Sequence, residues 1–241
     1  MHFLGRTIFQ NGKVRIPMEM EKQAKESFLQ LKTFWNYKMG TNHALVGNNE
    51  QVALRMLENV TTILEESGIR YCLTAGTLLG IVREERLLPW DTDLDIRLFR
   101  EDINKIPRVL WKIRFAGYLA RIRRQEYSDP PLIKGEKRII KIFHKIGFLK
   151  KGYVTMDCFI ASKQNGEYVW SCGGPKLYTK KSVPAHYYDD TRSLIFKGKS
   201  YKVPKMTEDY LTLRYGDWKK PIKIWDYTKD DGAIISSERK M

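Results

Sequence analysis

The chain has 241 residues, 43 Lys and Arg against 28 Asp and Glu, and a formal net charge of +15. This length suits one domain with additions, or at most two. The charge favours an anionic partner but does not choose among nucleotides, nucleic acid, acidic glycans and acidic lipid.

The cysteines Cys72, Cys158 and Cys172 have no paired spacing, which argues against a disulfide framework or a structural zinc site and favours a reducing compartment. The N-terminus has no signal-peptide pattern, and no apolar run approaches the roughly 20 residues that span a bilayer. We therefore expect a cytoplasmic enzyme.

The N-terminal third predicts an extension followed by a helix. Residues 6–16 predict a hairpin that turns at Asn11-Gly12, and Pro17 opens a helix to about Tyr37. Residues 39–49 have no periodicity and form the best internal linker. Asn49 is the expected cap of a helix over residues 50–67 that Gly68 ends. Residues 1–48 are therefore interpreted as a hairpin-helix extension.

Residues 71–99 carry the densest chemical pattern. An apolar strand reaches a Gly76-Thr77 corner, a short helix covers residues 78–82, and a second strand carries Asp93 and Asp95. Period-2 alternation puts both aspartates on one face of that strand. Two carboxylates that are so close repel each other unless a cation lies between them, so the pattern predicts a hard-metal site. The alternative is an exposed acidic turn, which the apolar flanks disfavour.

This stretch resembles the LicD family of phosphotransferases, which includes fukutin and fukutin-related protein. The resemblance rests on one ordered window: Gly76, Thr77, Leu78, Leu79, Gly80, Arg83, Pro89, Trp90, Asp91, Asp93 and Asp95. It implies an α+β fold with a nucleotidyltransferase-like mixed sheet, flanking helices and added hairpins. It also implies a Gly-Thr corner that holds nucleotide phosphate beside metal-binding aspartates.

After this window, residues 101–116 predict a helix that Pro107 kinks or divides, and residues 118–126 predict a strand. Residues 137–151 fit either a basic interfacial helix or a strand. The strand is preferred because the resemblance expects sheet here.

Residues 152–161 predict an apolar strand with one acid, Asp157, which needs an Arg or a metal as its partner. LicD-like sequences carry an Asp-Ile-Phe-Pro run at this place, where this chain has Asp-Cys-Phe-Ile. The resemblance therefore implies Asp157 as a third metal ligand. The histidines His2, His43, His144 and His186 show no metal-ligand spacing.

The last third predicts strand structure from residue 167, a hairpin over residues 192–203, and a helix capped by Thr207. The helix ends in a LicD-like element that comprises Tyr210, Leu211, Tyr215 and Gly216, with Trp218 shifted by one position. The catalytic domain is thus expected over residues 49–227, and residues 228–241 are expected to be a frayed polar tail.

The resemblance implies a transferase that moves a phospho-alcohol, such as phosphocholine or ribitol phosphate, from a CDP-activated donor to a hydroxyl of a glycan or lipid-linked glycan, releasing CMP. Asp93, Asp95 and Asp157 would hold Mg²⁺ or Mn²⁺. Gly76, Thr77 and Arg83 would bind donor phosphate. Either a carboxylate or the metal would activate the acceptor, and no nucleic-acid partner is expected.

Three alternatives remain open. A nucleotidyltransferase acting on RNA or a small molecule would use the same metal site. A nucleotide-sugar glycosyltransferase also uses Asp-x-Asp, but residues 1–70 lack the βαβ half that it needs. A non-catalytic module for anionic lipid or glycan explains the charge and leaves the buried acids unexplained.

The middle of the chain is dense in positive charge, which suggests peripheral contact with anionic lipid at the inner membrane face. Ile146, Phe148 and Leu149 are the expected shallow anchors. A solvated surface is the alternative. The basic residues are Arg121, Arg123, Arg124, Lys134, Lys137, Arg138, Lys141, Lys145, Lys150 and Lys151.

Overall fold

The computed structural model describes residues 8–10, 13–15, 43–147, 150–174, 177–222 and 225–239. The chain divides into two compact units, Met1–Asn42 and His43–Met241. In the first unit, β1 (Ile8–Gln10) pairs antiparallel with β2 (Lys13–Arg15), so the predicted hairpin is confirmed. The helix predicted over residues 17–37 lies outside the described residues.

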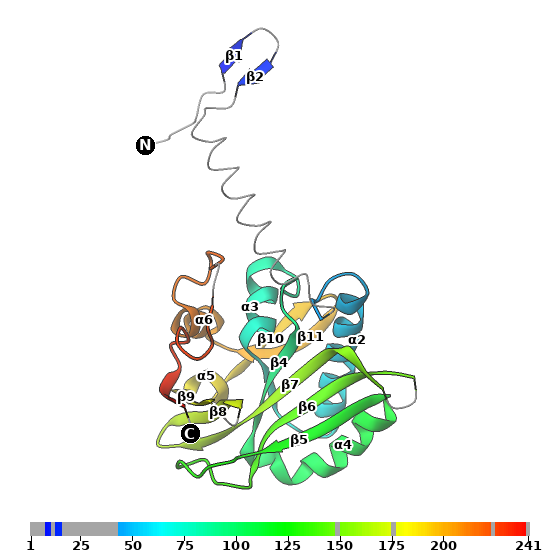
Figure 1. Cartoon of the computed structure of the whole chain (residues 1–241), viewed down its shortest axis with the longest axis vertical. Coiled ribbons are helices and arrows are strands. Elements are labelled where there is room, and N and C mark those ends of the chain that lie inside the picture. The colour runs from blue at the N-terminus through cyan, green and yellow to red at the C-terminus, as the bar shows by residue number, and fades with distance from the viewer. Residues whose placement is uncertain are drawn as a thin grey trace. The chain divides into compact units, whose positions relative to one another are not determined.

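The second unit begins six residues before the expected boundary, and it contains both helices and strands (Figure 1). In chain order they are α2 (Asn48–Glu66), β3 (Tyr71–Leu73), α3 (Ala75–Glu84), β4 (Asp93–Phe99), the 3₁₀ helix η1 (Arg100–Lys105), α4 (Ile106–Phe115), β5 (Tyr118–Arg124), β6 (Lys137–Ile146), β7 (Lys150–Gln164), β8 (Glu167–Gly174), β9 (Leu177–Pro184), α5 (His186–Asp189), β10 (Thr191–Phe196), β11 (Lys199–Pro204), α6 (Thr207–Tyr215) and β12 (Ile234–Arg239).

A mixed sheet organises this unit. Its strand order is β12-β9-β8-β7-β4-β3, with β6 and then β5 added beside β7. Strands β4 and β7 are parallel, and the other pairs are antiparallel. The first part of β7 pairs with β4 and β6, while its last three residues pair with β8. Strands β10 and β11 form a separate hairpin. The prediction of an α+β fold with a mixed sheet and added hairpins is confirmed.

The two faces of the sheet differ in chemistry because side chains alternate along each strand. Leu94, Met156 and Ile142 lie in one cross-strand row and are all buried. Helices α2 and α4 pack on this apolar face, α2 against β7 and β4, and α4 against β5 (Figure 1). The opposite face carries Asp93 and Asp95, so packing of the core directs the acidic residues away from these helices.

Local details correct three helix starts. Helix α2 begins at Asn48 after Gly47, so Asn49 is not its cap; the Asn49 amide instead donates to the Ala44 carbonyl at 3.0 Å. Helix α3 already begins at Ala75, which puts Gly76 and Thr77 in its first turn rather than in a corner before it. Helix α6 begins at Thr207 itself, after Met206.

Two ambiguous segments are resolved by the structure. Residues 137–146 form strand β6, which confirms the preferred interpretation. The helix expected over residues 101–116 is divided into η1 and α4, with Pro107 in the first turn of α4, where its missing N–H costs no hydrogen bond.

The prediction of a frayed C-terminal tail is wrong. Strand β12 pairs antiparallel with β9, and Asp231 just before it is only 3% exposed. The polar composition of this segment predicts exposure. The segment is nevertheless packed against the domain, because backbone pairing and a buried ion pair hold it in place of a row of apolar side chains.

The sequence analysis argued against a disulfide framework and against a membrane-spanning run, and both points can be compared with the described part of the chain. All three cysteines are buried and free. No helix in that part is both long and apolar enough to cross a bilayer.

Candidate active site

The acidic side chains of β4 and β7 lie in one cross-strand row. Asp95 is the direct neighbour of Asp157 in the parallel β4–β7 register, and Lys141 is the neighbour of Asp157 in the antiparallel β6–β7 register. Arg121 of β5 lies opposite Lys141 and completes the row. Adjacent strands are about 4.8 Å apart, so these side chains emerge next to one another on one face.

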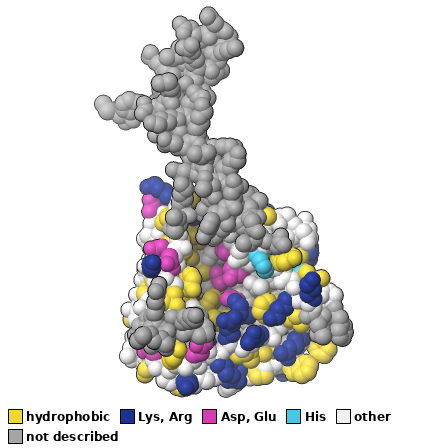
Figure 2. All heavy atoms as spheres, in the orientation of Figure 1, with side chains coloured by type: hydrophobic (Ala, Val, Ile, Leu, Met, Phe, Trp, Pro, Cys, Tyr) yellow, Lys and Arg dark blue, Asp and Glu magenta, His cyan; other side chains and the backbone are white. Residues whose placement is uncertain are grey.

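Asp93 lies on the same face, two residues before Asp95 and opposite Thr155. The sequence predicted that Asp93, Asp95 and Asp157 would converge, and the sheet register brings them onto one surface. Figure 2 shows acidic side chains at the centre of the visible face with basic side chains beside them. This arrangement defines the candidate site.

Lys141 and Asp157 form the closest polar contact of the row. The Lys141 Nζ donates to Asp157 Oδ2 at 2.5 Å, and the two side chains are 21% and 9% exposed. The other carboxylate oxygen, Asp157 Oδ1, is buried and has no hydrogen-bond partner among the described residues. Asp157 therefore has one oxygen paired with an ammonium group and one available to a further ligand.

The carboxylates of β4 are held at an electrostatic cost. Burial, followed by the charges of Asp91 and Asp157, raises the pKa of Asp93 to about 8. Burial, followed by Asp93, Asp91 and Asp157, also raises the pKa of Asp95 well above its usual range. Positive charge near these groups would relieve the repulsion.

Asp91 is a member of this cluster that the sequence analysis did not assign to the site. It hydrogen-bonds to Asp93 and raises the pKa of that residue. A Cβ atom added at Gly76 would lie 2.0 Å from Asp91 Oδ2, so the absence of a side chain at Gly76 makes room for this carboxylate. The alternation of Asp91, Asp93 and Asp95 in the sequence was the signal that could have found it.

Helix α3 is fixed against β4 by Thr77. Its hydroxyl accepts a hydrogen bond from the Asp95 backbone N–H at 2.8 Å, and the side chain is 3% exposed. The helix N-terminus, with its unpaired N–H groups, is thereby held beside the aspartates of β4. Thr77 thus links the strand that carries Asp93 and Asp95 to the helix that the sequence predicted to hold phosphate.

A buried polar network holds Thr74, the residue that precedes α3. The Thr74 hydroxyl is 2.7 Å from the Tyr210 hydroxyl, which accepts from Arg214 at 2.5 Å. Arg214 and Lys181 both pair with Asp231 at 2.6 Å. The network connects the C-terminal segment to the site, a role that sequence periodicity does not reveal because its members are far apart in the chain.

Arg83, predicted to contact donor phosphate, lies in the last turn of α3. Its guanidinium donates to Glu84 Oε1 at 2.8 Å and to the Trp218 carbonyl at 3.3 Å. It is therefore at the opposite end of the helix from Gly76 and Thr77, and it shares the Glu84 carboxylate with Arg86.

The carboxylate oxygens of Asp93, Asp95 and Asp157 have the chemistry that suits a hard divalent cation, but not the arrangement of a formed metal site. Among the described residues, no three His, Cys, Asp or Glu side chains stand arranged to hold a metal ion. The chemistry nevertheless fits: the donors are all carboxylate oxygens, Asp93 and Asp95 repel each other, and Asp157 Oδ1 is unpartnered. If Lys141 moved away from Asp157 Oδ2, both oxygens of Asp157 would be available as metal ligands beside Asp93 and Asp95.

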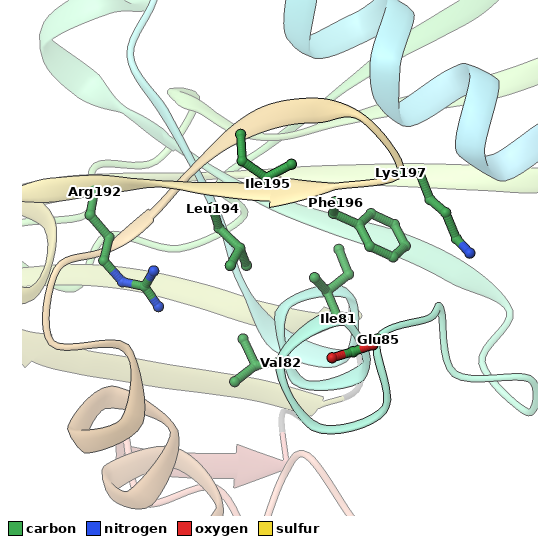
Figure 3. A pocket seen from close by; sticks show the side chains of 8 residues that line it. All are labelled: Ile81, Val82, Glu85, Arg192, Leu194, Ile195, Phe196 and Lys197. Atoms are coloured by element: carbon green, nitrogen blue, oxygen red, sulfur yellow. The ribbon is translucent and has the colours of Figure 1, made fainter.

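A hollow lies away from the carboxylates, between the end of α3 and strand β10 (Figure 3). It has a volume of about 430 Å³ and an apolar floor from Ile81, Val82 and Leu194, while Arg192 and Lys197 lie at its rim. Because its only acid is Glu85, this hollow has no carboxylate pair that could form a metal site.

The acidic row lies within the part of the chain that matches a nucleotidyltransferase domain. Residues 68–206 match the family described as "LicD/FKTN/FKRP, nucleotidyltransferase domain", and the chain belongs to this family. The expectation that the chain belongs to the LicD family is confirmed.

Two relatives illustrate the similarity. "Ribitol-5-phosphate transferase FKTN" of Mus musculus is 25% identical over 177 residues, which cover 73% of this chain and 35% of the relative. "Lipopolysaccharide cholinephosphotransferase LicD" of Haemophilus influenzae is 33% identical over 54 residues, which cover 22% of this chain and 20% of the relative. The chain thus spans about a third or less of the length of these relatives.

A solved structure, "Solution Structure of Antibiotic-Resistance Factor ANT(2'')-Ia Reveals Substrate-Regulated Conformation Dynamics", is 11% identical, with a TM-score of 0.40. The likeness covers 72% of this chain and 78% of that chain, and it is too distant to bear on function.

Proposed function

We propose that this chain transfers a phospho-alcohol from a CDP-activated donor to a hydroxyl of a glycan or lipid-linked glycan and releases CMP. The observation that carries the proposal is the row of Asp95 and Asp157 in direct register, with Asp93 on the same face. Two relatives, named as a ribitol-5-phosphate transferase and a cholinephosphotransferase, support the class of group that is transferred.

In this proposal Asp93, Asp95 and Asp157 hold Mg²⁺ or Mn²⁺. The cation would neutralise charge that develops on the phosphoryl oxygens and on the leaving CMP. The buried, unpartnered Asp157 Oδ1 supports this role for the third aspartate. Asp91 contacts Asp93 and would hold that ligand in orientation, since an outer carboxylate restricts the rotamers of the group it contacts.

The first turn of α3 would receive the donor phosphate. Gly76 and Thr77 contribute backbone N–H groups at a helix N-terminus, which favours anions. The Thr77 hydroxyl is engaged with the Asp95 N–H, so its main contribution is to hold helix and strand together. Arg83 could bind donor phosphate only if it released Glu84 and turned to the phosphate. Otherwise it would contact the part of the nucleotide that lies farthest from the first turn of α3.

The transfer itself is a substitution at the phosphorus next to the alcohol. The acceptor oxygen forms a new P–O bond, the pyrophosphate P–O bond breaks, and CMP leaves with the bridging oxygen. The acceptor proton passes to a carboxylate of the row. Lys141 and Arg121 extend the row from the carboxylates and would contact the negative charge of either substrate.

The test is incubation of the full chain with CDP-choline, CDP-ribitol and related CDP-alcohols, with Mg²⁺ or Mn²⁺, while CMP release is measured. Release that depends on the metal, on one CDP-alcohol and on Asp95 supports the proposal. Turnover of nucleoside triphosphates in place of CDP-alcohols would contradict it and favour a nucleotidyltransferase that acts on RNA or a small molecule.

The location proposed with this function is the cytoplasm, with contact at the inner face of the membrane. The basic residues predicted to form one patch do not share one environment. Arg138 is 5% exposed and donates to the Gly173 carbonyl, while Lys141 is paired with Asp157. Phe148 and Leu149 lie outside the described residues, and Ile146 is 42% exposed. The membrane contact therefore needs a different surface.

A further inference from the structure

Helix α4 exposes two aromatic side chains to solvent. Trp111 and Phe115 are 61% and 85% exposed, and their ring centroids are 6.2 Å apart. They lie four residues apart and so share one side of the helix. The other side of α4 is buried against the core through Ile106, Val109, Leu110 and Ile113. The aromatic pair is therefore on the outer face of a helix that is firmly packed, and it contributes nothing to the core.

The surroundings of this pair carry charge of a single sign. Residues 103–125, which comprise the end of η1, α4 and β5, contain Lys and Arg but no Asp or Glu. Arg108, Arg114, Arg121 and Arg123 are exposed, and none of the four forms an ion pair with a described residue. Lys105, at the start of the stretch, pairs with Asp102 at 2.7 Å, but no described acidic residue forms an ion pair with the four arginines.

Strand β5 places this charge at an edge of the sheet. It pairs with β6 alone among the described strands, and it packs beside α4 (Figure 1). Arg121 and Arg123 of β5 emerge on the acidic face of the sheet, whereas Arg108 and Arg114 lie on α4, the helix that carries the aromatic pair. Trp and Arg both match the interface of a bilayer, where the rings enter the headgroup region and the guanidinium groups contact lipid phosphate.

We infer that the outer face of α4 forms a binding surface for an anionic lipid bilayer, with Trp111 and Phe115 as the inserted side chains. Arg108 and Arg114, on the same exposed side of this helix, supply the contacts to lipid phosphate. The single sign of charge on this stretch favours an anionic bilayer as the occupant.

The outer face of α4 is separate from the active site, because α4 packs on the apolar face of the sheet and the carboxylates emerge on the opposite face. The membrane contact therefore does not rest on the proposed function.

The test uses the full chain and sedimentation with vesicles of phosphatidylcholine alone or mixed with phosphatidylglycerol. We expect binding to the anionic vesicles that weakens as salt is raised, since the interaction is in part electrostatic. The double variant Trp111→Ser/Phe115→Ser should bind at least about tenfold more weakly, because two rings no longer enter the interface. The charge variant Arg108→Glu/Arg114→Glu should lose binding at low salt.

The matched control is Ile195→Ser, since Ile195 is a 69% exposed apolar residue on the separate β10–β11 hairpin and should not change vesicle binding. Wild-type protein that fails to bind anionic vesicles at low salt, or a double variant that binds as well as wild type, would overturn the inference. So would a dimer in solution that the double variant dissociates. CMP release measured without vesicles reports on the proposed function separately.

Discussion

Lys141 and Asp157 face each other across β6 and β7, with the Lys141 Nζ 2.5 Å from Asp157 Oδ2. The lysine therefore occupies a carboxylate oxygen that the proposed cation would use. An ammonium group and a divalent cation at the same carboxylate compete, and this competition can be measured.

The variant Lys141→Met should bind Mn²⁺ more tightly than wild type, since no ammonium group competes for Asp157. It should also release CMP more slowly, because a cation of the substrate-facing row is lost. Without metal, its free energy of unfolding should fall by about 1–3 kcal/mol, since Asp157 is left buried without a partner. Electron paramagnetic resonance would measure Mn²⁺ binding. Lys150→Met, at an exposed lysine, is the control. Unchanged Mn²⁺ affinity would contradict the competition.

The variant Asp95→Asn should abolish CMP release while the fold is kept, since one ligand charge is removed at nearly constant shape. The raised pKa of Asp95 means that its ionised form is costly in the metal-free protein. The melting temperature without metal should therefore stay equal to that of wild type or rise. The increase that Mg²⁺ causes should disappear. Thermal unfolding with and without Mg²⁺ checks this, and a variant still stabilised by Mg²⁺ to the wild-type extent would argue against a ligand role.

Gly76 and Gly80 both lie in α3, and alanine should lower activity at the first position and stability at the second. At Gly76 a Cβ meets the end of the Asp91 side chain, which can move, so Gly76→Ala should fold but lose CMP release as Asp91 shifts. At Gly80 a Cβ lies 2.7 Å from the Arg86 backbone carbonyl, which cannot move easily. Gly80→Ala should therefore cost about 1–3 kcal/mol of stability. Urea unfolding and CMP release on the soluble fraction distinguish the two, and equal activity of Gly76→Ala and wild type would remove the packing role of Asp91.

Asp231 should make stability depend on acid pH. Its pKa is lowered to about 2 despite burial, because Arg214 and Lys181 pair with the ionised form. A depressed carboxyl pKa contributes stability above the unfolded pKa of about 3.9, and this is lost as the pH falls through 2. The contribution is about 2 kcal/mol. Asp231→Asn should lose this pH dependence and cost about 3–5 kcal/mol, since it leaves two buried cations short of a partner.

Asp190→Asn is the control for this prediction, because the Asp190–Lys205 pair is exposed and should contribute less than about 1 kcal/mol. Chemical unfolding of wild type and both variants between pH 2 and pH 6 gives the comparison. Equal stability of Asp231→Asn and Asp190→Asn would show that the network below α3 does not stabilise the fold.

The sequence by itself determined those features that depend on residues close together in the chain. The alternation of Asp93, Leu94, Asp95 and Ile96 fixes which side chains share a face of β4, because this follows from the two-residue repeat of any strand. The ordered window from Gly76 to Asp95 was enough to predict the family. The position of Pro107 predicted the division between η1 and α4 for an equally local reason.

Only the tertiary structure decided how separate segments meet. No local pattern states that Asp157 lies beside Asp95 or that Lys141 occupies one of its oxygens, because strand register is set by packing of the whole apolar face. The carboxylate of Asp91 against Gly76 has the same origin. The C-terminal segment was misjudged because its polar residues predict exposure, whereas Asp231 is buried by a lysine and an arginine that folding brings from elsewhere in the chain.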